Sequence, residues 1–404
     1  MISLQAIIDL PASKSISNRV LIIQSLCEEK FEIENLSQAN DTLLLQNILS
    51  SIKETTEIQP IQAEDAGTPF RFLTAYLSTL QDKLFLLSGN DRMNERPIAS
   101  LVDGLNCLGA DISYSKKNGF PPLLIKGKKL QENKINIDSS ESSQFVSALC
   151  LIAPTLQNGL TINVNEKTVS ASYIEMTLSV MRDFGIEYQK TTNEIIIPTQ
   201  NYVAKKYCVE NDWSSACFFY AMAMIADEAT ITLNGLQMKS CQGDAFISEL
   251  CQSFGIDTTF KNNNCIITKT EIDNCQLSTI NLKDYPDLAI PFIVACAIKY
   301  PSVQIIGIAH LVHKESNRIV ALQNELQKVH IFLHYEHDTL TFQNKMTECN
   351  SRTINFNSYN DHRIVMSLNL FTLLGFTLHF DIKNCVKKSF PQYWKEFEKL
   401  NATK

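Results

Sequence analysis

One pattern of helix, turn and strand recurs along this chain, and it limits the possible folds more than any other feature. In each copy an amphipathic helix ends in a glycine-like stop, and a strand, a polar turn and a second strand follow. The stops are Gly109, Gly185 and Gly255, and a weaker fourth copy has His330 there. Glycine ends a helix cheaply because it has no Cβ to clash in the left-handed conformation. The copies cover residues 101–127, 178–199, 247–270 and 321–343.

The spacing of these stops indicates how many units the chain contains. Consecutive glycine stops lie 70 to 76 residues apart, so the 404 residues have room for about six units. Each unit combines helix and strand, so we predict an α/β protein. Units of this length are too long for a leucine-rich type of solenoid, and we expect them to share cores grouped into two domains. No Gly-, Ser- or Pro-rich linker marks the boundary.

Composition excludes several classes of protein. A net charge of -7 argues against a broad nucleic-acid surface. The twelve cysteines form no C-x-x-C pair and no zinc-ligand spacing, which favours free thiols in a reducing compartment. The N-terminus has no signal-peptide pattern, and the longest apolar stretch, 288–298, is far shorter than the roughly 20 residues that span a bilayer. We therefore expect a cytoplasmic protein with no membrane or nucleic-acid partner.

Basic residues gather beside turn signals, and each basic stretch runs into an apolar segment typical of a helix. The first-turn N–H groups and the dipole of a helix attract anions, and arginine adds a planar fork that suits phosphate and carboxylate. A single such residue could equally be a solvated charge beside an N-cap serine. Six stretches in one acidic chain indicate one or two substrates with several negative charges. The residues are Lys14, Arg19, Arg71, Arg92, Arg96, Lys314, Arg318, Arg363, Lys387 and Lys388.

Other polar residues stand at the entrances of further helical segments. Ser142, Ser143 and Gln144 in the ESSQF stretch, 141–145, could hold a phosphate or hydroxyl groups, and Ser170 in TVSASY could act in the same way. Each of them could also be no more than a helix cap.

Two carboxylates are candidates for proton transfer. Asp287 lies in YPDLA just before an apolar helix, and Glu315 directly follows Lys314. Each carboxylate could simply stabilise a helix N-terminus. In a basic, anion-binding pocket the two become candidates for a general base and a general acid.

Taken together and in this order, the motifs resemble the 5-enolpyruvylshikimate-3-phosphate synthase family. The resemblance implies two domains, each of three βαβαββ units, which agrees with the count of about six units reached from the glycine stops. It implies one domain at 13–211, a second at 1–12 plus 212–404, and an active site in the cleft between them. The motifs run from Pro11 to Pro391 and are PASKSISNR, DAGTPFR, RMNERP, SSQF, YPDLA, KESNR, YNDHR and KKSFP.

The resemblance also implies a reaction. The 5-hydroxyl of shikimate 3-phosphate attacks C2 of phosphoenolpyruvate while C3 is protonated, and the tetrahedral intermediate then loses phosphate. This addition–elimination serves chorismate and aromatic amino acid biosynthesis. It needs no metal and no redox cofactor, and its partners are the two small-molecule substrates. We expect the enzyme to be a monomer.

Site residues are carried over by their positions in the motifs. The resemblance implies that Asp287 acts as base, that Glu315 acts as acid and that Lys14 stabilises the intermediate, although the assignment of the two proton transfers stays open. The residues implied for shikimate 3-phosphate are Lys14, Ser15, Arg19, Ser142, Ser143, Ser170, Asp287 and Lys314. Those implied for phosphoenolpyruvate are Lys14, Gly67, Arg96, Gln144, Arg318, Arg363 and Lys388.

The chain departs from the family pattern at several positions. Ala12 replaces a glycine, Asp65 an asparagine, and Phe72 a proline. His310 and Val312 replace an asparagine and an arginine upstream of Lys314, which leaves the contact made at position 310 open.

Two alternatives compete with this interpretation. The related UDP-N-acetylglucosamine enolpyruvyl transferase should carry a cysteine in a mobile loop near RMNERP, where this chain has Arg96 and no cysteine between Cys27 and Cys107. The other alternative is an inactive anion-binding homologue, which would bind both substrates without releasing phosphate. The charged residues of the motifs are all present, which disfavours it.

Overall fold

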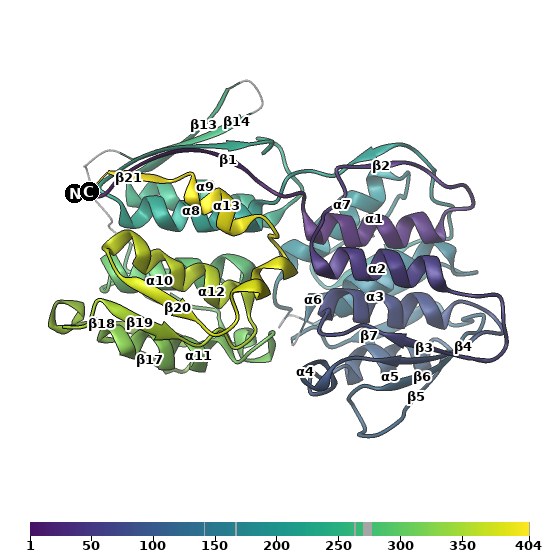
Figure 1. Cartoon of the computed structure of the whole chain (residues 1–404). Helices are drawn as coiled ribbons and strands as arrows, with labels where there is room; N and C mark the ends of the chain where they lie inside the picture. Colours follow the sequence, from purple (N-terminus) through teal and green to yellow (C-terminus); the bar gives the residue numbers. More distant parts are fainter. Residues whose placement is uncertain (141, 166–167, 262–263, 270–276, 404) are drawn as a thin grey trace. The chain divides into compact units, whose positions relative to one another are not determined.

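A computed structural model describes residues 1–140, 142–165, 168–261, 264–269 and 277–403, and within these the chain forms two compact units. Unit 1 consists of Met1–Ser13 and Glu210–Lys404, and unit 2 is Lys14–Val209. Both units combine helices and strands, so the predicted α/β class is confirmed (Figure 1). Glu141 of the ESSQF stretch and residues 262–263 and 270 of the third predicted copy lie outside the described residues.

Unit 2 packs its helices against small mixed sheets, with strand orders β3-β4-β6-β5, β7-β8-β10-β9 and β11-β2. Its helices are α1 (Lys14–Leu26), α2 (Asn40–Ser51), α3 (Gly67–Ser78), α4 (Asp91–Asn94), α5 (Ala99–Cys107), α6 (Ser143–Ile152) and α7 (Ala171–Asp183). Its strands are β2 (Ile33–Glu34), β3 (Ile58–Gln62), β4 (Leu84–Ser88), β5 (Asp111–Tyr114), β6 (Leu123–Lys126), β7 (Lys134–Ile137), β8 (Leu160–Val164), β9 (Gln189–Lys190), β10 (Glu194–Ile197) and β11 (Tyr207–Cys208).

Unit 1 has sheets of the orders β13-β14-β12-β1-β21, β15-β16-β18-β17 and β19-β20. Its helices are α8 (Trp213–Ile225), α9 (Ile247–Leu250), α10 (Pro286–Lys299), α11 (Arg318–Leu326), α12 (His362–Leu368) and α13 (Tyr393–Glu398). Its strands are β1 (Ser3–Asp9), β12 (Glu228–Asn234), β13 (Ile256–Lys261), β14 (Asn264–Lys269), β15 (Thr279–Asn281), β16 (Gln304–Ile306), β17 (Ile331–Glu336), β18 (Thr339–Asn344), β19 (Thr353–Phe356), β20 (Thr377–Phe380) and β21 (Asn401–Thr403).

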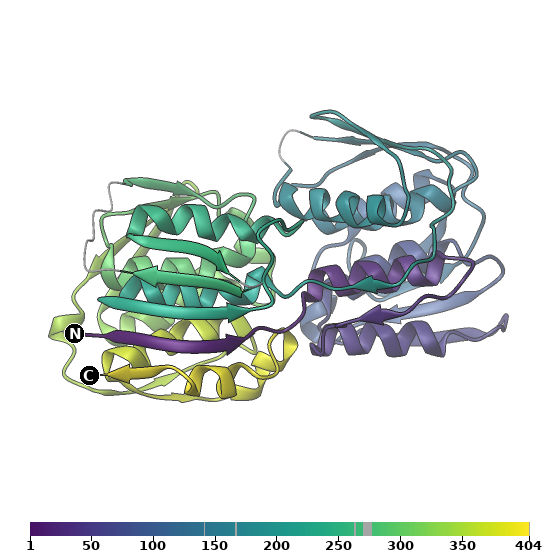
Figure 2. The same cartoon turned by 90° about the horizontal axis from the view of Figure 1, so that it is seen from above.

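The larger sheets share one pairing scheme. In unit 2, β3 pairs parallel with β4, while β6 pairs antiparallel with both β4 and β5. The sheet of β7 to β10 and the sheet of β15 to β18 repeat this order, and β1, β12, β14 and β13 do so in unit 1. Figure 2 shows β1, in purple, flanked by the green strands of this sheet and by the yellow C-terminal strand. The count of six sequence units stays a prediction.

The predicted helix stops are confirmed by the backbone. Gly109, Gly185 and Gly255 all have positive φ angles, of 100°, 84° and 73°. His330, the stop of the fourth copy, also adopts the left-handed conformation, with φ 59°. Each of them follows a helical segment and precedes a strand or an extended segment, so a residue in the left-handed conformation ends the helix in all four copies.

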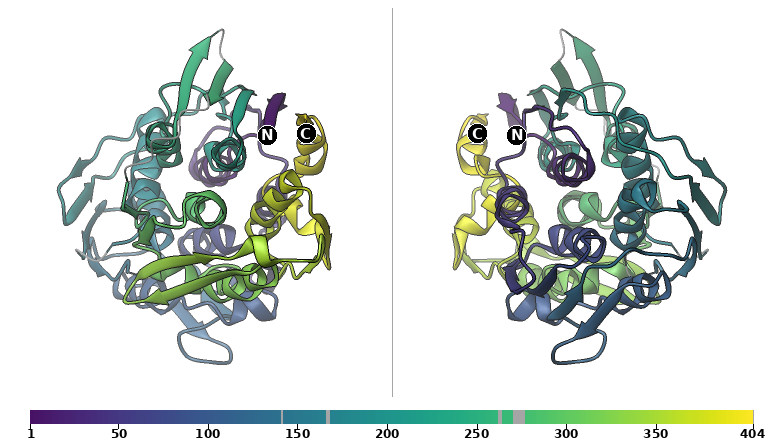
Figure 3. Two further views of the ribbon diagram at one scale, coloured as in Figure 1. Left: turned by 90° about the vertical axis from the view of Figure 1, so that its left-hand side faces the viewer. Right: turned by 90° about the vertical axis from the view of Figure 1, so that its right-hand side faces the viewer.

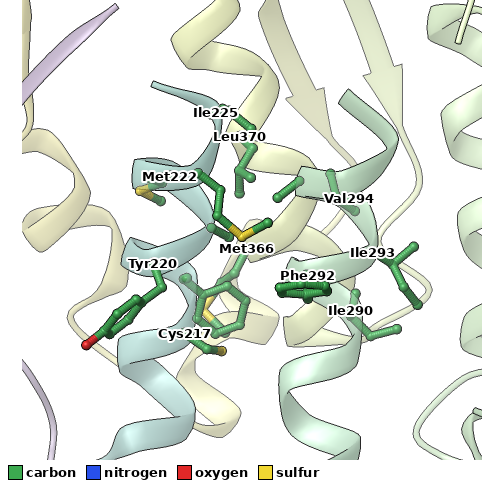
Figure 4. Close-up of a cluster of buried hydrophobic side chains, with 14 of the residues drawn as sticks. Cys217, Tyr220, Met222, Ile225, Ile290, Phe292, Ile293, Val294, Met366 and Leu370 are labelled. Carbon is green, nitrogen blue, oxygen red and sulfur yellow. The ribbon is translucent and has the colours of Figure 1, made fainter. Parts of the chain in front are cut away.

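The core of unit 1 is built around helices with no polar face. Every residue of α8 is buried, and α10 is buried from Leu288 to Ile298, as expected for helices that are apolar all round. In Figure 3 the helices of unit 1 are seen end-on in the left panel, with the sheets on the outside. Figure 4 shows how Met222 of α8, Phe292 of α10 and Met366 of α12 share one apolar cluster. The N-termini of these helices, where the polar residues lie, are therefore positioned by a buried apolar core.

Two further predictions concern the chain as a whole. The cysteines in the described ranges are free thiols, as predicted, and Cys150, Cys217 and Cys296 of the apolar runs are buried. Within the same ranges, no helix combines the length and the apolar character that crossing a bilayer requires.

Candidate active site

Lys14 is the first residue of α1, and its ammonium group is held by a carboxylate of the next helix. Its Nζ donates to Oδ2 of Asp41 at 3.1 Å, where Asp41 lies in the first turn of α2. The Lys14 side chain is 16% exposed and that of Asp41 is 5% exposed, so the pair is largely shielded from water. This contact fixes the direction of a cation at the entrance of α1, where the sequence predicted one.

Arg19 lies one turn further along α1 and is fully buried. Its guanidinium donates to Oγ1 of Thr177 at 2.7 Å, to the carbonyl of Ser15 at 2.8 Å and to the carbonyl of Tyr173 at 3.0 Å. It also lies over the ring of Phe72, 5.4 Å from its centroid. Arg19 therefore connects α1 with α7 and supports the backbone of Ser15, in addition to any role toward an anion.

The entrance of α3 has no room for a side chain at Gly67. A Cβ added there would lie 2.5 Å from Nη1 of Arg96, which is itself 6% exposed. Arg71 also joins the segment of Gly67 to the segment of Arg96. Its guanidinium donates to the carbonyl of Gly67 at 3.1 Å and to the carbonyl of Pro97 at 3.3 Å. Glycine is needed here because it lets a guanidinium approach the backbone closely.

The entrance of α6 carries the predicted neutral donors. Ser142 is the N-cap, and its Oγ accepts from the backbone N–H of Gln144 at 3.2 Å. The Gln144 amide donates in turn to Oγ1 of Thr68 at 2.9 Å, so the entrances of α3 and α6 meet. Ser143 is buried at the first position of the helix. Gly67, Arg96 and Gln144 are thus brought together as predicted.

Ser170 precedes α7 in an unusual backbone conformation. Its φ of 57° is in the left-handed region, which non-glycine residues adopt at a cost, and its side chain is 3% exposed. Strain of this kind persists only where the surrounding structure imposes it, and it is concentrated at functional sites. The sequence identified Ser170 by its motif, but it gave no sign of this conformation.

In unit 1, Arg318 is the centre of a group of carboxylates. It is the first residue of α11 and its side chain is 1% exposed. Its Nε donates to Oδ2 of Asp361 at 2.9 Å, its Nη2 donates to Oε2 of Glu315 at 2.9 Å, and its Nη1 lies 3.9 Å from Oδ1 of Asp287. Burial by itself would lower the pKa of Arg318, but the charges of Asp361 and Glu315 outweigh it and raise that pKa.

Arg363 approaches the same group from α12. Its Nη2 lies 3.0 Å from Oδ2 of Asp287, and its Nη1 donates to the carbonyl of Asp287 at 2.6 Å. Asp287, Glu315, Arg318 and Arg363, which the sequence predicted from three motifs, YPDLA, KESNR and YNDHR, therefore belong to one cluster. Charge-assisted bonds of this kind are short and strongly directional, so the cluster fixes two cations and two candidate acid–base groups relative to one another.

Asp361 holds this cluster together, although sequence reasoning did not single it out. It is fully buried, it accepts from Arg318 and from Oγ of Ser316, and it caps α12 by accepting from the backbone N–H of Arg363 at 3.0 Å. Its place in the YNDHR motif, directly before a helix that contains an arginine, was the available signal.

Asp244 is a second buried carboxyl that the sequence analysis missed. It is 2% exposed and accepts from Oγ of Ser214 at 2.5 Å. Burial, followed by the charge of Asp287, raises the pKa of Asp244 to about 7. The group therefore titrates near neutral pH, and no motif signalled it.

His310, at the position that departs from the family pattern, is buried beside the cluster. Burial, and then the charges of Lys314 and Arg318, lower the pKa of His310 to about 3, so the imidazole is neutral at physiological pH. Within the described residues its Nε2 has no hydrogen-bond partner. Lys314 follows at the end of the 3-10 helix Ala309–His313, and Lys388, 5% exposed, ends the 3-10 helix Lys383–Lys388, which packs against α12.

Comparisons with known proteins bear on this arrangement. The family model described as EPSP synthase (3-phosphoshikimate 1-carboxyvinyltransferase) matches residues 2–397. A 3-phosphoshikimate 1-carboxyvinyltransferase of Bacteroides fragilis is 36% identical, with 98% of this chain and 95% of that protein covered. A 3-phosphoshikimate 1-carboxyvinyltransferase of Haemophilus influenzae is 31% identical, with 98% of this chain and 97% of that protein covered. The solved structure of the EPSP synthase of Acinetobacter baumannii matches with a TM-score of 0.73 at 20% identity, and the match covers 100% of this chain and 98% of that one. This match shows a shared fold. The chain belongs to the EPSP synthase (3-phosphoshikimate 1-carboxyvinyltransferase) family.

Proposed function

We propose that the chain transfers the enolpyruvyl group of phosphoenolpyruvate to the 5-hydroxyl of shikimate 3-phosphate and releases phosphate. Membership of the family and the names of its relatives support this reaction over transfer to UDP-N-acetylglucosamine. The observation that carries the proposal is the cluster of Arg318, Arg363, Asp287 and Glu315, which joins anion-binding groups to groups that can transfer protons.

In this proposal phosphoenolpyruvate is bound mainly by cations. A phosphate and a carboxylate both suit the planar fork of arginine, which donates two parallel hydrogen bonds. The backbone of Gly67 contributes through the close approach that only glycine allows. The residues proposed to bind this substrate are Lys14, Gly67, Arg96, Gln144, Arg318, Arg363 and Lys388.

Shikimate 3-phosphate offers hydroxyl groups as well as anions, so serines are proposed to bind it together with cations. Ser142 accepts a backbone hydrogen bond, and a hydroxyl that accepts still has its own proton to donate. Its role as a helix cap is therefore compatible with a role as a donor to the substrate. The residues proposed to bind this substrate are Lys14, Ser15, Arg19, Ser142, Ser143, Ser170, Asp287 and Lys314.

The proton transfers are proposed to use the two carboxylates of the cluster. Asp287 removes the proton of the 5-hydroxyl as its oxygen bonds to C2 of phosphoenolpyruvate, and Glu315 delivers a proton to C3. Loss of phosphate from the tetrahedral intermediate then returns a C3 proton to Glu315, and the proton that Asp287 took from the 5-hydroxyl leaves with the phosphate, so both carboxyl groups return to their starting states. Lys14 is proposed to stabilise the negative charge of the intermediate and of the departing phosphate.

The test is an assay of free phosphate with purified protein. Release should require both shikimate 3-phosphate and phosphoenolpyruvate together. Release with UDP-N-acetylglucosamine in place of shikimate 3-phosphate would favour the related transferase. A thermal shift with both substrates but no release would indicate an inactive binding protein. A single shared cleft, a monomeric state and a cytoplasmic location stay predictions.

A further inference from the structure

The carboxylate of Glu325 is fully buried in the last turn of α11, and it receives four hydrogen bonds. Its Oε2 accepts from the backbone N–H of Asn357 at 2.9 Å and from Nζ of Lys328 at 2.5 Å. Its Oε1 accepts from the hydroxyl of Tyr359 at 2.9 Å and from the side-chain amide of Asn357 at 3.2 Å. A buried charge is costly unless it is paired and hydrogen-bonded, so this carboxylate and the segment that surrounds it depend on each other.

That segment, 357–360, has a strained backbone. Tyr359 and Asn360 are consecutive non-glycine residues with φ angles of 54° and 50°. Residues other than glycine adopt this left-handed region at an energetic cost, so the conformation requires outside support. Ser358 provides part of it, because its N–H donates to Asp381 at 2.7 Å and its Oγ accepts from the N–H of Asn360. The contacts with Glu325 add to this support, together with a hydrogen bond from the side-chain amide of Asn324 to the Tyr359 hydroxyl at 3.4 Å and one from the N–H of Asp361 to the carbonyl of Ser358 at 2.9 Å.

The strained segment 357–360 leads directly into Asp361, the residue that contacts Arg318 and caps the helix of Arg363. Arg318 and Glu325 are seven residues apart on α11, which places them on the same face of the helix, two turns apart. Arg318 contacts Asp361, and Glu325 contacts Asn357 and Tyr359, so one helix face holds both ends of the same short segment. The position of Asp361 relative to Arg318 therefore depends on both contacts.

We propose that Glu325 is a positioning residue for the proposed phosphoenolpyruvate site: it holds residues 357–360 so that Asp361 orients Arg318 and caps the helix that carries Arg363. This inference rests on the proposed assignment of these two arginines to phosphoenolpyruvate. Glu325 acts through Asp361 and lies in none of the motifs. Its loss should therefore weaken binding of phosphoenolpyruvate and leave the affinity for shikimate 3-phosphate nearly unchanged.

The shape of the site indicates why the residue is a glutamate. Two donors converge on each of its oxygens, so a glutamine in the same place must set its NH₂ group against two N–H or O–H donors. Glu325→Gln thus keeps the volume of the side chain but breaks the hydrogen-bond pattern. Tyr359→Phe removes one donor only, and Lys328→Gln removes the half-exposed cation while leaving the contacts to the segment.

The experiment compares Michaelis constants for the two substrates in the full-length chain. Glu325→Gln should raise KM for phosphoenolpyruvate about tenfold, with KM for shikimate 3-phosphate changed less than about twofold. Tyr359→Phe should raise KM for phosphoenolpyruvate about threefold, and Lys328→Gln should have the same two Michaelis constants as the wild type. Unfolding midpoints and far-UV circular dichroism check that each variant is folded, and Tyr359→Phe provides the test if Glu325→Gln does not fold.

Several outcomes would overturn the proposal. Unchanged constants in Glu325→Gln and Tyr359→Phe would do so, as would equal rises for both substrates, which indicate a general structural defect. An effect of Lys328→Gln equal to that of Glu325→Gln would mean that charge pairing, and not the loop, is what matters. The variant Arg363→Ala distinguishes a wrong positioning role for Glu325 from a wrong assignment of the phosphoenolpyruvate site. If Arg363→Ala raises KM for phosphoenolpyruvate and Glu325→Gln does not, only the positioning role is lost. If neither raises it, the site assignment fails as well.

Discussion

Two buried arginines of unit 2, Arg19 and Arg71, and two of unit 1, Arg318 and Arg363, differ in the acceptors that their described contacts include. In unit 2, Arg19 and Arg71 donate to hydroxyl groups and backbone carbonyls. In unit 1, Arg318 and Arg363 pair with carboxylates, at distances of 2.9 to 3.0 Å. Neutral acceptors fix the direction of a guanidinium and leave its charge in place, whereas carboxylates offset the charge and bring proton-transfer groups next to it.

This difference suggests a division of tasks. Under the proposed function, unit 2 would supply positive charge for binding anions, and unit 1 would supply cations already combined with the proposed acid–base groups. Lys14 is an exception, since it belongs to unit 2 and pairs with the buried carboxylate of Asp41. Its proposed role near the reacting atoms fits this exception, because a lysine that is held in one orientation loses less freedom when an anion arrives.

The strongest test of this comparison is Glu315→Gln. If Glu315 only balanced the charge of Arg318, glutamine could still accept its hydrogen bond and activity would change little. If Glu315 transfers a proton, kcat should fall about a hundredfold or more, because that role is lost in the transition state. Steady-state phosphate release measures kcat. Asp227→Asn, which removes a carboxylate that pairs with Lys299 in the same unit, should keep wild-type turnover.

Arg363→Ala tests whether the arginines of unit 1 still bind an anion although carboxylates accompany them. KM for phosphoenolpyruvate should rise about thirtyfold, as expected for the loss of a charge-assisted contact, and KM for shikimate 3-phosphate should rise far less. Initial rates with each substrate varied in turn give both constants. An equal rise in the two would place Arg363 elsewhere and would weaken the proposed division of tasks.

Gly67→Ala probes the positive charge of unit 2 without removing it. The added Cβ would lie 2.5 Å from Nη1 of Arg96, so the guanidinium must move, and KM for phosphoenolpyruvate should rise about tenfold. Gly104→Ala is a control in the same unit, since its Cβ would meet Cδ1 of Ile135 at 2.6 Å and Cδ1 of Ile137 at 3.4 Å, and neither isoleucine belongs to the proposed site. Similar kinetic constants in the two variants would argue against a role for Arg96 in binding this substrate.

The smallest expected effect concerns His310, whose pKa is lowered first by burial and then by the charges of Lys314 and Arg318 in unit 1. The pKa of His310 in the folded chain, about 3, lies below its ordinary value of 6.5, so between these values the unfolded chain binds more protons. Stability is therefore lost as pH falls through this window, by about 0.7 kcal/mol between pH 7 and pH 6, or about threefold in the unfolding constant.

Urea unfolding of the wild type and of His310→Asn at the two pH values measures this difference. The variant lacks the titrating group, so it should lose less stability than the wild type over the same step. Equal losses would mean that His310 is protonated in the folded chain and that carboxylates, not cations, dominate the charge around it.

Sequence patterns predicted the parts of the fold that depend on local chemistry. Gly109, Gly185 and Gly255 end their helices in the left-handed conformation because that preference belongs to glycine itself. The resemblance to a family likewise implied that Asp287 and Arg363 belong to one active site, although 76 residues separate them. The structure places Nη2 of Arg363 3.0 Å from Oδ2 of Asp287. Here the resemblance to a family supplied information that spacing alone does not contain.

The parts that sequence could not predict depend on contacts between distant segments. Glu325 is a charged residue that sequence alone would place at the surface, and its buried contacts with Asn357 and Tyr359 join segments more than 30 residues apart. Arg19 looked like an anion ligand, and its contacts with Thr177 and Tyr173, more than 150 residues away, are invisible in the sequence. The left-handed conformation of Ser170 was hidden for the same reason, because its neighbours impose it.

The pairing of strand β1 has a consequence for the order in which the chain can fold during synthesis. Unit 2 is one uninterrupted stretch, so all of its strands exist once residue 209 has left the ribosome. Strand β1 is made first, yet its neighbours β12 and β21 are made hundreds of residues later. The backbone edges of β1 and the apolar side chains of Leu4 and Ile8, which are buried in the finished unit, must therefore wait without their partners while the rest is translated. Early binding by a chaperone, or rapid completion of unit 2, would protect that edge from aggregation.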